Sequence, residues 1–218
     1  MITKPYQWLM LMVSVLSTSL WANLPSDKEL QAQIEATQKL EQTDATKSQL
    51  QTLTDTQQFL NQIAQQKSDS SELEKQIKES QAGIDASKTR LTKLKAVQLP
   101  TQDELAKKSS KELQNLATTL QTQLDRAQQD LAQLNAQVVA QNAVPNKAQT
   151  TLATIAARKQ QITSALGNAN LTDADKIKYE AESTLLDLQN SYNQTLLSGN
   201  DSLLALYSAQ LDEKKAVQ

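Results

Sequence analysis

Apolar and small residues recur along most of the chain in alternating steps of three and four, which is the spacing of one face of an α-helix. No stretch alternates apolar and polar residues for long enough to predict a strand. The stripe with the most regular spacing comprises Leu73, Ile77, Ser80, Ile84, Ser87, Leu91 and Leu94. A stripe of this kind packs against other helices. The sequence therefore predicts an extended α-helical scaffold rather than a catalytic domain.

Similar stripes precede and follow this one, and each predicts one buried helix face. Before it come Leu30, Ile34 and Leu40, and then Leu50, Leu53, Gln57, Leu60 and Ala64. After it come Leu113, Leu116, Leu120, Leu124, Ala127, Leu131, Leu134 and Val138, and then Ala148, Leu152, Ile155, Lys159, Ile162 and Leu166. The last two stripes comprise Ile177, Ala181, Leu185, Leu188 and Tyr192, and then Leu203, Leu206, Tyr207 and Leu211.

Capping and breaking residues predict where these helices begin and end. Pairs that can form an N-terminal cap are Ser26 with Glu29, Ser109 with Glu112, and Thr172 with Asp175. Breaks are predicted at 42–45, 68–71, Leu99-Pro100, Val144-Pro145, 167–170 and 198–201. Gly167 is predicted to cap a helix in the left-handed conformation. Gly83 is predicted to be a plain surface glycine of its helix, with a kink or a close helix approach as the alternative. A short helical arm over 101–108 is expected to bury Leu105.

The predicted connections are short, so consecutive helices are expected to be antiparallel neighbours. The fold class is therefore all-α, an elongated array of antiparallel helical hairpins that resembles a coiled coil. Gly and Pro together supply only seven residues, 3 Gly and 4 Pro, which leaves few places for the chain to turn. The last helix meets no Gly or Pro before Gln218, which favours a natural chain that continues past this residue.

The N-terminal residues 1–22 have the composition of a secretory signal peptide. Lys4 precedes the apolar run Trp8–Leu20, and a cleavage site is expected after Ala22. The alternative is an uncleaved transmembrane anchor, but the run is shorter than the roughly 20 residues that span a bilayer. Residues 23–218 are then one helical domain on the far side of the membrane, truncated at its C-terminal end.

Composition excludes several function classes. The chain has no Cys and no His, so the commonest nucleophilic thiol, general base and metal ligands are missing. The 22 basic and 24 acidic residues are spread along the sequence without a basic block, which argues against a nucleic-acid partner. We predict no catalytic, cofactor-binding or metal-binding residue, no cofactor, and no enzymatic activity.

A few residues still deserve a functional interpretation beside a structural one. Asp173 and Asp175 resemble a metal-binding acidic pair, although acidic residues also favour the first turn of a helix. Five lysines could meet an anionic surface, but interleaved acids favour a solvated face: Lys75, Lys78, Lys88, Lys93 and Lys95, among Glu72, Glu74, Glu79 and Asp85. The tyrosines of the last helices, Tyr179, Tyr192 and Tyr207, are expected to pack. Gln57 and Lys159 occupy stripe positions, where a polar residue can set register or oligomeric state.

Several segments together resemble a known family. They are 24–34 directly after the signal peptide, 53–56, 130–137, and 199–212 with its Gly199-Asn200-Asp201 and Leu206-Tyr207. Their order resembles the N-terminal periplasmic region, or MscS porin domain, of large mechanosensitive channels of the MscK/MscM type in the MscS superfamily.

The resemblance implies a domain of an inner-membrane channel that opens under tension and releases solutes in osmotic downshock. It implies a homo-heptameric channel whose other subunits are the partners, with helix–helix protein contacts and a membrane connection through a C-terminal part that this chain lacks. No pore residue has a counterpart here, so this segment is not expected to conduct ions. The alternative is a stand-alone periplasmic coiled-coil adaptor of the cell envelope.

Overall fold

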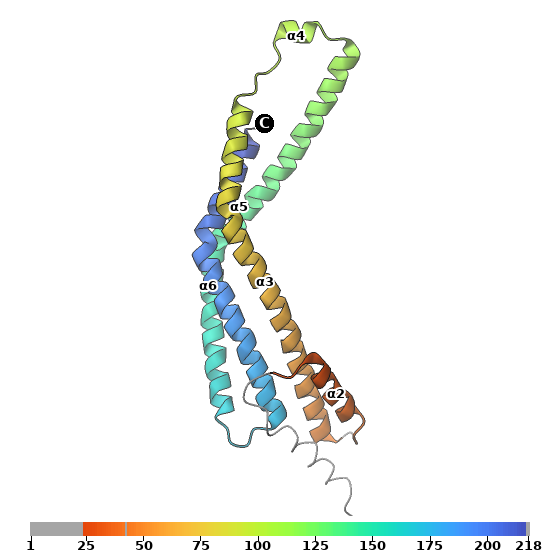
Figure 1. Ribbon diagram of the computed structural model, residues 1–218, viewed down its shortest axis with the longest axis vertical. Coiled ribbons are helices and arrows are strands. Elements are labelled where there is room, and N and C mark those ends of the chain that lie inside the picture. The colour runs from red at the N-terminus through yellow and green to blue at the C-terminus, as the bar shows by residue number, and fades with distance from the viewer. Residues whose placement is uncertain (1–23, 42, 217–218) are drawn as a thin grey trace, which may run out of the picture. The chain divides into compact units, whose positions relative to one another are not determined.

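The computed structural model describes residues 24–41 and 43–216, all of whose regular structure is helical. The helices are α2 (Asp27–Gln38), α3 (Asp44–Lys95), α4 (Gln102–Ala106), α5 (Ser110–Leu166) and α6 (Asp173–Lys215) (Figure 1). The predicted all-α fold class is confirmed. The predicted signal peptide, residues 1–22, lies outside the described residues.

Three predicted N-terminal caps are present. The Ser26 backbone N–H donates to Glu29 Oε2 over 2.8 Å, and Ser109 makes the same bond to Glu112. Thr172 Oγ1 accepts from the Asp175 backbone N–H over 3.1 Å. These caps satisfy backbone donors that have no partner inside the helix, and they fix where α2, α5 and α6 begin.

Three predicted breaks are wrong, because α3, α5 and α6 each run on without interruption. The polar cluster 68–71 lies inside α3, Pro145 inside α5, and 198–201 inside α6. A run of Ser and Asp disfavours a helix only weakly, and proline at an interior position costs one backbone hydrogen bond without forcing an end. The neighbouring helices outweigh these local preferences.

The helix ends near 95–101 and 166–172 agree with the sequence, but two details differ. Gly167 does not take the left-handed conformation, since no described glycine has a positive φ. Its N–H instead donates to the Thr163 carbonyl over 3.2 Å. Leu105 is only half-buried, because α4 buries none of its residues.

The chain divides into two compact units, and α3, α5 and α6 contribute to both. The first unit comprises the described residues up to Gln66 together with Ala156–Gln189. Here α2 packs Leu30 and Ile34 against Leu53 of α3, with Ala174 of α6 beside them. Thr56 and Ile63 are buried in this part of α3, whereas the predicted Ala64 is exposed.

The second unit comprises Lys67–Ile155 and Asn190–Gln218. Every member of the most regular stripe is buried or half-buried here, including Ser80 and Ser87, which expose 3% and 0% of their surface. Because serine side chains are small and polar, these two positions bury little apolar area.

Gly83 and Gly199 lie at close contacts between α3 and α6 in the second unit. A Cβ at position 199 would lie 2.2 Å from Ile77 Cδ1, and one at position 83 would lie 2.6 Å from Leu206 Cδ1. The prediction that Gly83 lies on a plain surface is therefore wrong, and Gly199 is a packing residue rather than a helix break.

Candidate functional site

Polar contacts tie α3 and α6 together in one register within each unit. In the first unit Lys178 Nζ lies 2.6 Å from Asp55 Oδ2 and Thr52 Oγ1 donates to Asp175 over 3.3 Å. In the second unit Arg90 holds Glu213. All three pairs join residues 123 apart. A constant separation means that α3 and α6 run parallel at these contacts.

The pairs between α5 and α6 show the opposite direction. In the second unit Gln141 donates to Asn200 over 3.0 Å, and Lys214 pairs with Asp130 at 2.6 Å. In the first unit Arg158 donates from Nε and Nη2 to the two oxygens of Glu182 over 2.5 and 2.8 Å. Residue numbers rise on α6 as they fall on α5, which confirms the predicted antiparallel packing of these consecutive helices.

Arg90 and Glu213 make the most extensive of these contacts in the second unit. Arg90 donates from Nε and Nη2 to the two Glu213 oxygens over 2.7 and 2.9 Å, and Nη2 also donates to Ser87 Oγ. The Arg90 guanidinium is the main cause that lowers the pKa of Glu213. The Glu213 side chain exposes 11% of its surface and Arg90 53%, so one end of the pair is sheltered from water. Paired geometry of this kind fixes register better than a single ion pair.

The two polar residues predicted on stripe positions both make contacts between helices. The Gln57 amide of α3 donates to Gln31 of α2 over 3.2 Å, and Lys159 of α5 pairs with Asp187 of α6. Both are half-buried. Their positions are compatible with the register role predicted for them.

The pair Asp173 and Asp175 forms the N-terminal turn of α6. Asp175 accepts from Thr172 Oγ1 over 2.7 Å, and Asp173 pairs with Lys176 at 3.4 Å. This geometry is that of a helix cap. No group of three or more His, Cys, Asp or Glu residues arranged to hold a metal occurs in the part of the chain that the structure describes.

The other predicted candidates lie where packing or solvation explains them. The five candidate lysines of α3 and the acids between them are exposed, and Gln81 donates to Asp85 in the same part of the helix. Tyr179, Tyr192 and Tyr207 are half-buried. Burial is the main cause that raises the pKa of Tyr192, as expected for a phenol packed between helices.

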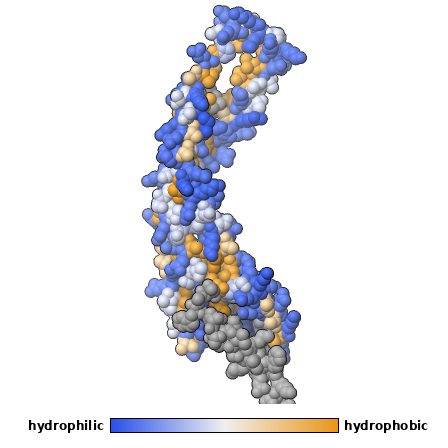
Figure 2. Space-filling view, viewed as in Figure 1, coloured by the Kyte–Doolittle hydropathy of each residue, from blue (hydrophilic) through white to orange (hydrophobic). Residues whose placement is uncertain are grey.

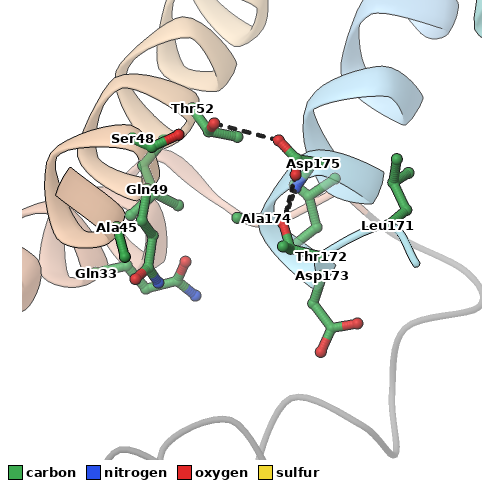
Figure 3. Close-up of a pocket in the computed structure, with 12 residues that line it drawn as sticks. Gln33, Ala45, Ser48, Gln49, Thr52, Leu171, Thr172, Asp173, Ala174 and Asp175 are labelled. Atoms are coloured by element: carbon green, nitrogen blue, oxygen red, sulfur yellow. Dashed lines mark hydrogen bonds between the residues drawn. The ribbon is translucent and has the colours of Figure 1, made fainter. Parts of the chain in front are cut away.

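A pocket of about 590 Å³ lies in the first unit where α3 and α6 begin. Figure 3 shows Ser48 and Thr52 on the α3 side and Thr172 to Asp175 on the α6 side. Its lining offers amide, hydroxyl and carboxylate groups around Leu53 and Ile177. Asp175 already accepts from Thr52 and Thr172, so the polar groups serve to join the helix starts.

Sequence reasoning missed the paired residues Asp55, Arg90, Arg158, Glu182 and Glu213. Each flanks an apolar stripe rather than belonging to it. Opposite charges that flank two apolar stripes can indicate ion pairs between the helices, but only once the alignment of the two helices is known.

Comparison with known proteins identifies the family. Residues 33–218 match the model described as "Mechanosensitive ion channel porin domain". An uncharacterized MscS family protein of Haemophilus influenzae is 32% identical over 188 residues, covering 86% of this chain and 17% of that protein. The mechanosensitive channel MscK of Escherichia coli is 29% identical over 201 residues, covering 87% of this chain and 18% of that protein. No solved structure matches.

The chain spans less than a fifth of the length of these two relatives. Within residues 24–41 and 43–216, no helix combines the length and apolar content that crossing a bilayer requires. The matched region is nonetheless most of the sequence, and the chain belongs to the mechanosensitive ion channel porin domain family.

Proposed function

We propose that this chain is a periplasmic helical domain of a mechanosensitive channel subunit that contributes to channel assembly or gating in osmotic downshock. The observation that carries the proposal is the family match over residues 33–218. In this proposal residues 1–22 are a signal peptide that directs export. The proposed channel is a homo-heptamer of the inner membrane, and sequence outside this chain would connect the helical domain to the membrane.

The packing supports a mechanical role based on protein contacts rather than catalysis. Several buried layers between the helices carry small or polar side chains, with Thr56 and Ser87 each fully buried. Such layers bury less apolar area than leucine layers and give weaker association per layer. The ion pairs between helices hold neighbouring helices in alignment, while the apolar contacts between them are modest. This combination suits a domain that must deform without changing which residues of its helices are aligned. Ion conduction is not part of the role of this segment.

A chimera tests this proposal. Residues 24–218 replace the matching region of Escherichia coli MscK, and the chimera is compared with MscK lacking that region. Patch-clamp recording measures the membrane tension at half-maximal opening, and blue native electrophoresis measures assembly. The proposal expects the chimera to restore the assembly or the opening tension that the deletion changes. A chimera that matches the deletion in both measurements contradicts it.

Two matched variants of the same chimera test whether the contacts between helices transmit force or whether the channel needs only a folded domain at this place. Glu213→Gln removes the charge that Arg90 holds in the second unit, whereas Glu79→Gln changes an exposed glutamate of α3. If register contacts transmit force, only the first variant shifts the opening tension. An equal shift for both variants rules out a specific contribution of the ion pair.

A further inference from the structure

The first part of α5, residues 110–140, packs loosely in the second unit, and we call it the α5 N-terminal segment. The stripe pattern predicts Leu113 and Leu120 as buried, but the structure contradicts this, since they expose 37% and 54% of their surface. From the start of α5 to Arg126, two further leucines of the stripe are half-buried and every other side chain is exposed. Figure 1 shows α5 separating from α3 toward α4, and Figure 2 shows apolar surface on both sides of that separation.

The α5 N-terminal segment contacts α6 only through its last turns before residue 140. Ala127 and Leu131 are buried there. Asp130 between them pairs with Lys214 of α6 at 2.6 Å, but these two side chains expose 46% and 36% of their surface. An ion pair this accessible to water contributes little to stability. The contacts that resist a movement of this segment are therefore few.

The α5 N-terminal segment is followed by a helix turn that lacks one backbone hydrogen bond. Pro145 lies inside α5 and has no backbone N–H, so the Gln141 carbonyl cannot accept the bond that residue 145 would otherwise donate. The proline ring also crowds that carbonyl. An interior proline is one of the few causes of a sharp kink in a helix. The turn from Gln141 to Pro145 is thus the place where α5 bends most easily.

From this turn onward α5 is tied firmly to α6. The Gln141 side-chain amide donates to Asn200 Oδ1 of α6 over 3.0 Å, and both residues are buried. Ala148 and Ile155 are buried as well, and their spacing of seven from Gln141 places all three on one face of α5. The firm contact between α5 and α6 therefore begins at the same turn that the proline weakens.

Beside the α5 N-terminal segment, α3 and α6 remain attached to each other. Arg90 of α3 donates to both carboxylate oxygens of Glu213 and also to the fully buried Ser87. Glu213 directly precedes the lysine that pairs with the segment, so this contact lies at the level of the segment. Gly199 of α6 packs closely against Ile77 of α3. The α3–α6 pair is therefore the fixed side of this part of the unit, and α5 is the side with freedom to move.

We propose that the α5 N-terminal segment swings as a unit about the turn from Gln141 to Pro145, away from the α3–α6 pair and back. The exposed ion pair between Asp130 and Lys214 opens and closes with this motion. Gln123 lies about 27 Å from Gln141 along the helix, so a kink of about 20° moves it by about 9 Å. The bend is a property of this chain and does not rest on the proposed channel role, so a failed chimera leaves it standing.

Distances between spin labels test the proposal directly, because the sequence has no Cys of its own. Lys88→Cys places a reference label on α3, and Gln123→Cys places the second label on the α5 N-terminal segment. In the control pair Gln149→Cys replaces Gln123→Cys, so the second label lies on α5 beyond the turn. All three positions are exposed. Double electron–electron resonance measures the distance distribution of each pair in the 218-residue chain, with and without Pro145→Ala.

We expect the distribution of the Lys88–Gln123 pair to be wider than that of the control pair by about 9 Å, and Pro145→Ala to remove most of this excess width. Pro100→Ala replaces a proline that lies outside the helices and should leave both widths unchanged. Equal widths of the two pairs in the unsubstituted chain overturn the proposal. It is also overturned if Pro145→Ala changes the width of the Lys88–Gln123 pair no more than Pro100→Ala does.

Discussion

Replacing Gly199 by alanine gives the most direct test of the close approach between α3 and α6. The added Cβ would lie 2.2 Å from Ile77 Cδ1 and 2.6 Å from Ile77 Cγ1. The Cδ1 atom can swing away, but Cγ1 sits on a β-branched carbon whose χ1 angle is strongly restricted in a helix. One of the two helices must therefore shift.

Two opposing terms set the magnitude. Alanine is preferred over glycine inside a helix by about 1 kcal/mol, and overpacking of a well-packed contact costs about 1–3 kcal/mol. We expect Gly199→Ala to lower the free energy of unfolding by about 1 kcal/mol, which lowers the melting temperature by about 2–4 °C in a chain of this size. Urea and thermal unfolding followed by far-ultraviolet circular dichroism measure both quantities.

Gly83 and Gly167 supply matched controls. At Gly83 only the tip of Leu206 lies closer than 3.8 Å to the added Cβ, and a leucine tip can rotate away. Gly83→Ala is therefore expected to stabilise the protein by about 0.5–1 kcal/mol through helix preference. Gly167→Ala meets only ordinary contacts, the nearest at 3.5 Å, and is expected to be neutral within about 0.5 kcal/mol.

Truncation of Ile77 completes the argument. In the Ile77→Ala background the obstructing Cγ1 is gone, so Gly199→Ala should become neutral or stabilising. The double-mutant cycle is expected to show a coupling of about 1–2 kcal/mol between the two positions. The reasoning is refuted if Gly199→Ala alone stabilises the protein as much as Gly83→Ala does.

Three further predictions follow from the polar contacts and the helix interiors. The Arg90 guanidinium lowers the pKa of Glu213 below its ordinary value of 4.5, so the pair stabilises the fold above that pH and loses this contribution as the pH falls through the lowered pKa. Urea unfolding at several pH values should show that Glu213→Gln removes part of the loss of stability in acid. An unchanged dependence of stability on pH would contradict the pair's role. Asn200→Ala leaves the Gln141 amide without its buried acceptor and should cost about 1–3 kcal/mol, measured by urea unfolding, whereas a neutral result would mean that water replaces the bond. Pro145→Ala restores a backbone N–H inside α5 and should raise the melting temperature, since an interior proline costs a helix about 3 kcal/mol. No increase in the melting temperature would contradict this cost at position 145.

The sequence predicts the buried faces of this fold better than its helix boundaries. Stripe positions such as Leu73, Ile84 and Ala181 are buried because helical periodicity depends only on local spacing. Ends were correct near Pro100 and Gly167, where a breaking residue comes shortly before a capping residue of the next helix. The break predicted at 42–45 is also present, since α2 ends at Gln38 and α3 begins at Asp44. The polar cluster at 68–71, in contrast, did not end a helix.

The contacts between helices were harder to predict than the helices themselves. Asp55 and Lys178 are 123 residues apart, and nothing local to either residue indicates its partner. Periodicity shows which side of a helix is buried. It does not show how far the helix is shifted lengthwise relative to its neighbour, because a shift by whole turns leaves the same side buried. The parallel pairing of α3 with α6 depends on that alignment, so the ion pairs and the pocket at the helix starts could not be located from spacing.

Interior glycines show most clearly why local signals failed. Gly199, with Ser198, Asn200 and Asp201 around it, has the composition of a turn, and an isolated chain would be flexible there. In the fold the missing Cβ is what lets Ile77 approach, so the residue that weakens the helix locally strengthens its contact with α3. The local cost is about 1 kcal/mol, whereas separating the helices by a side chain there would open several layers of contacts at once. A glycine within a strong three-four stripe, with no proline or capping box beside it, is therefore better interpreted as a site of close helix approach than as a helix end.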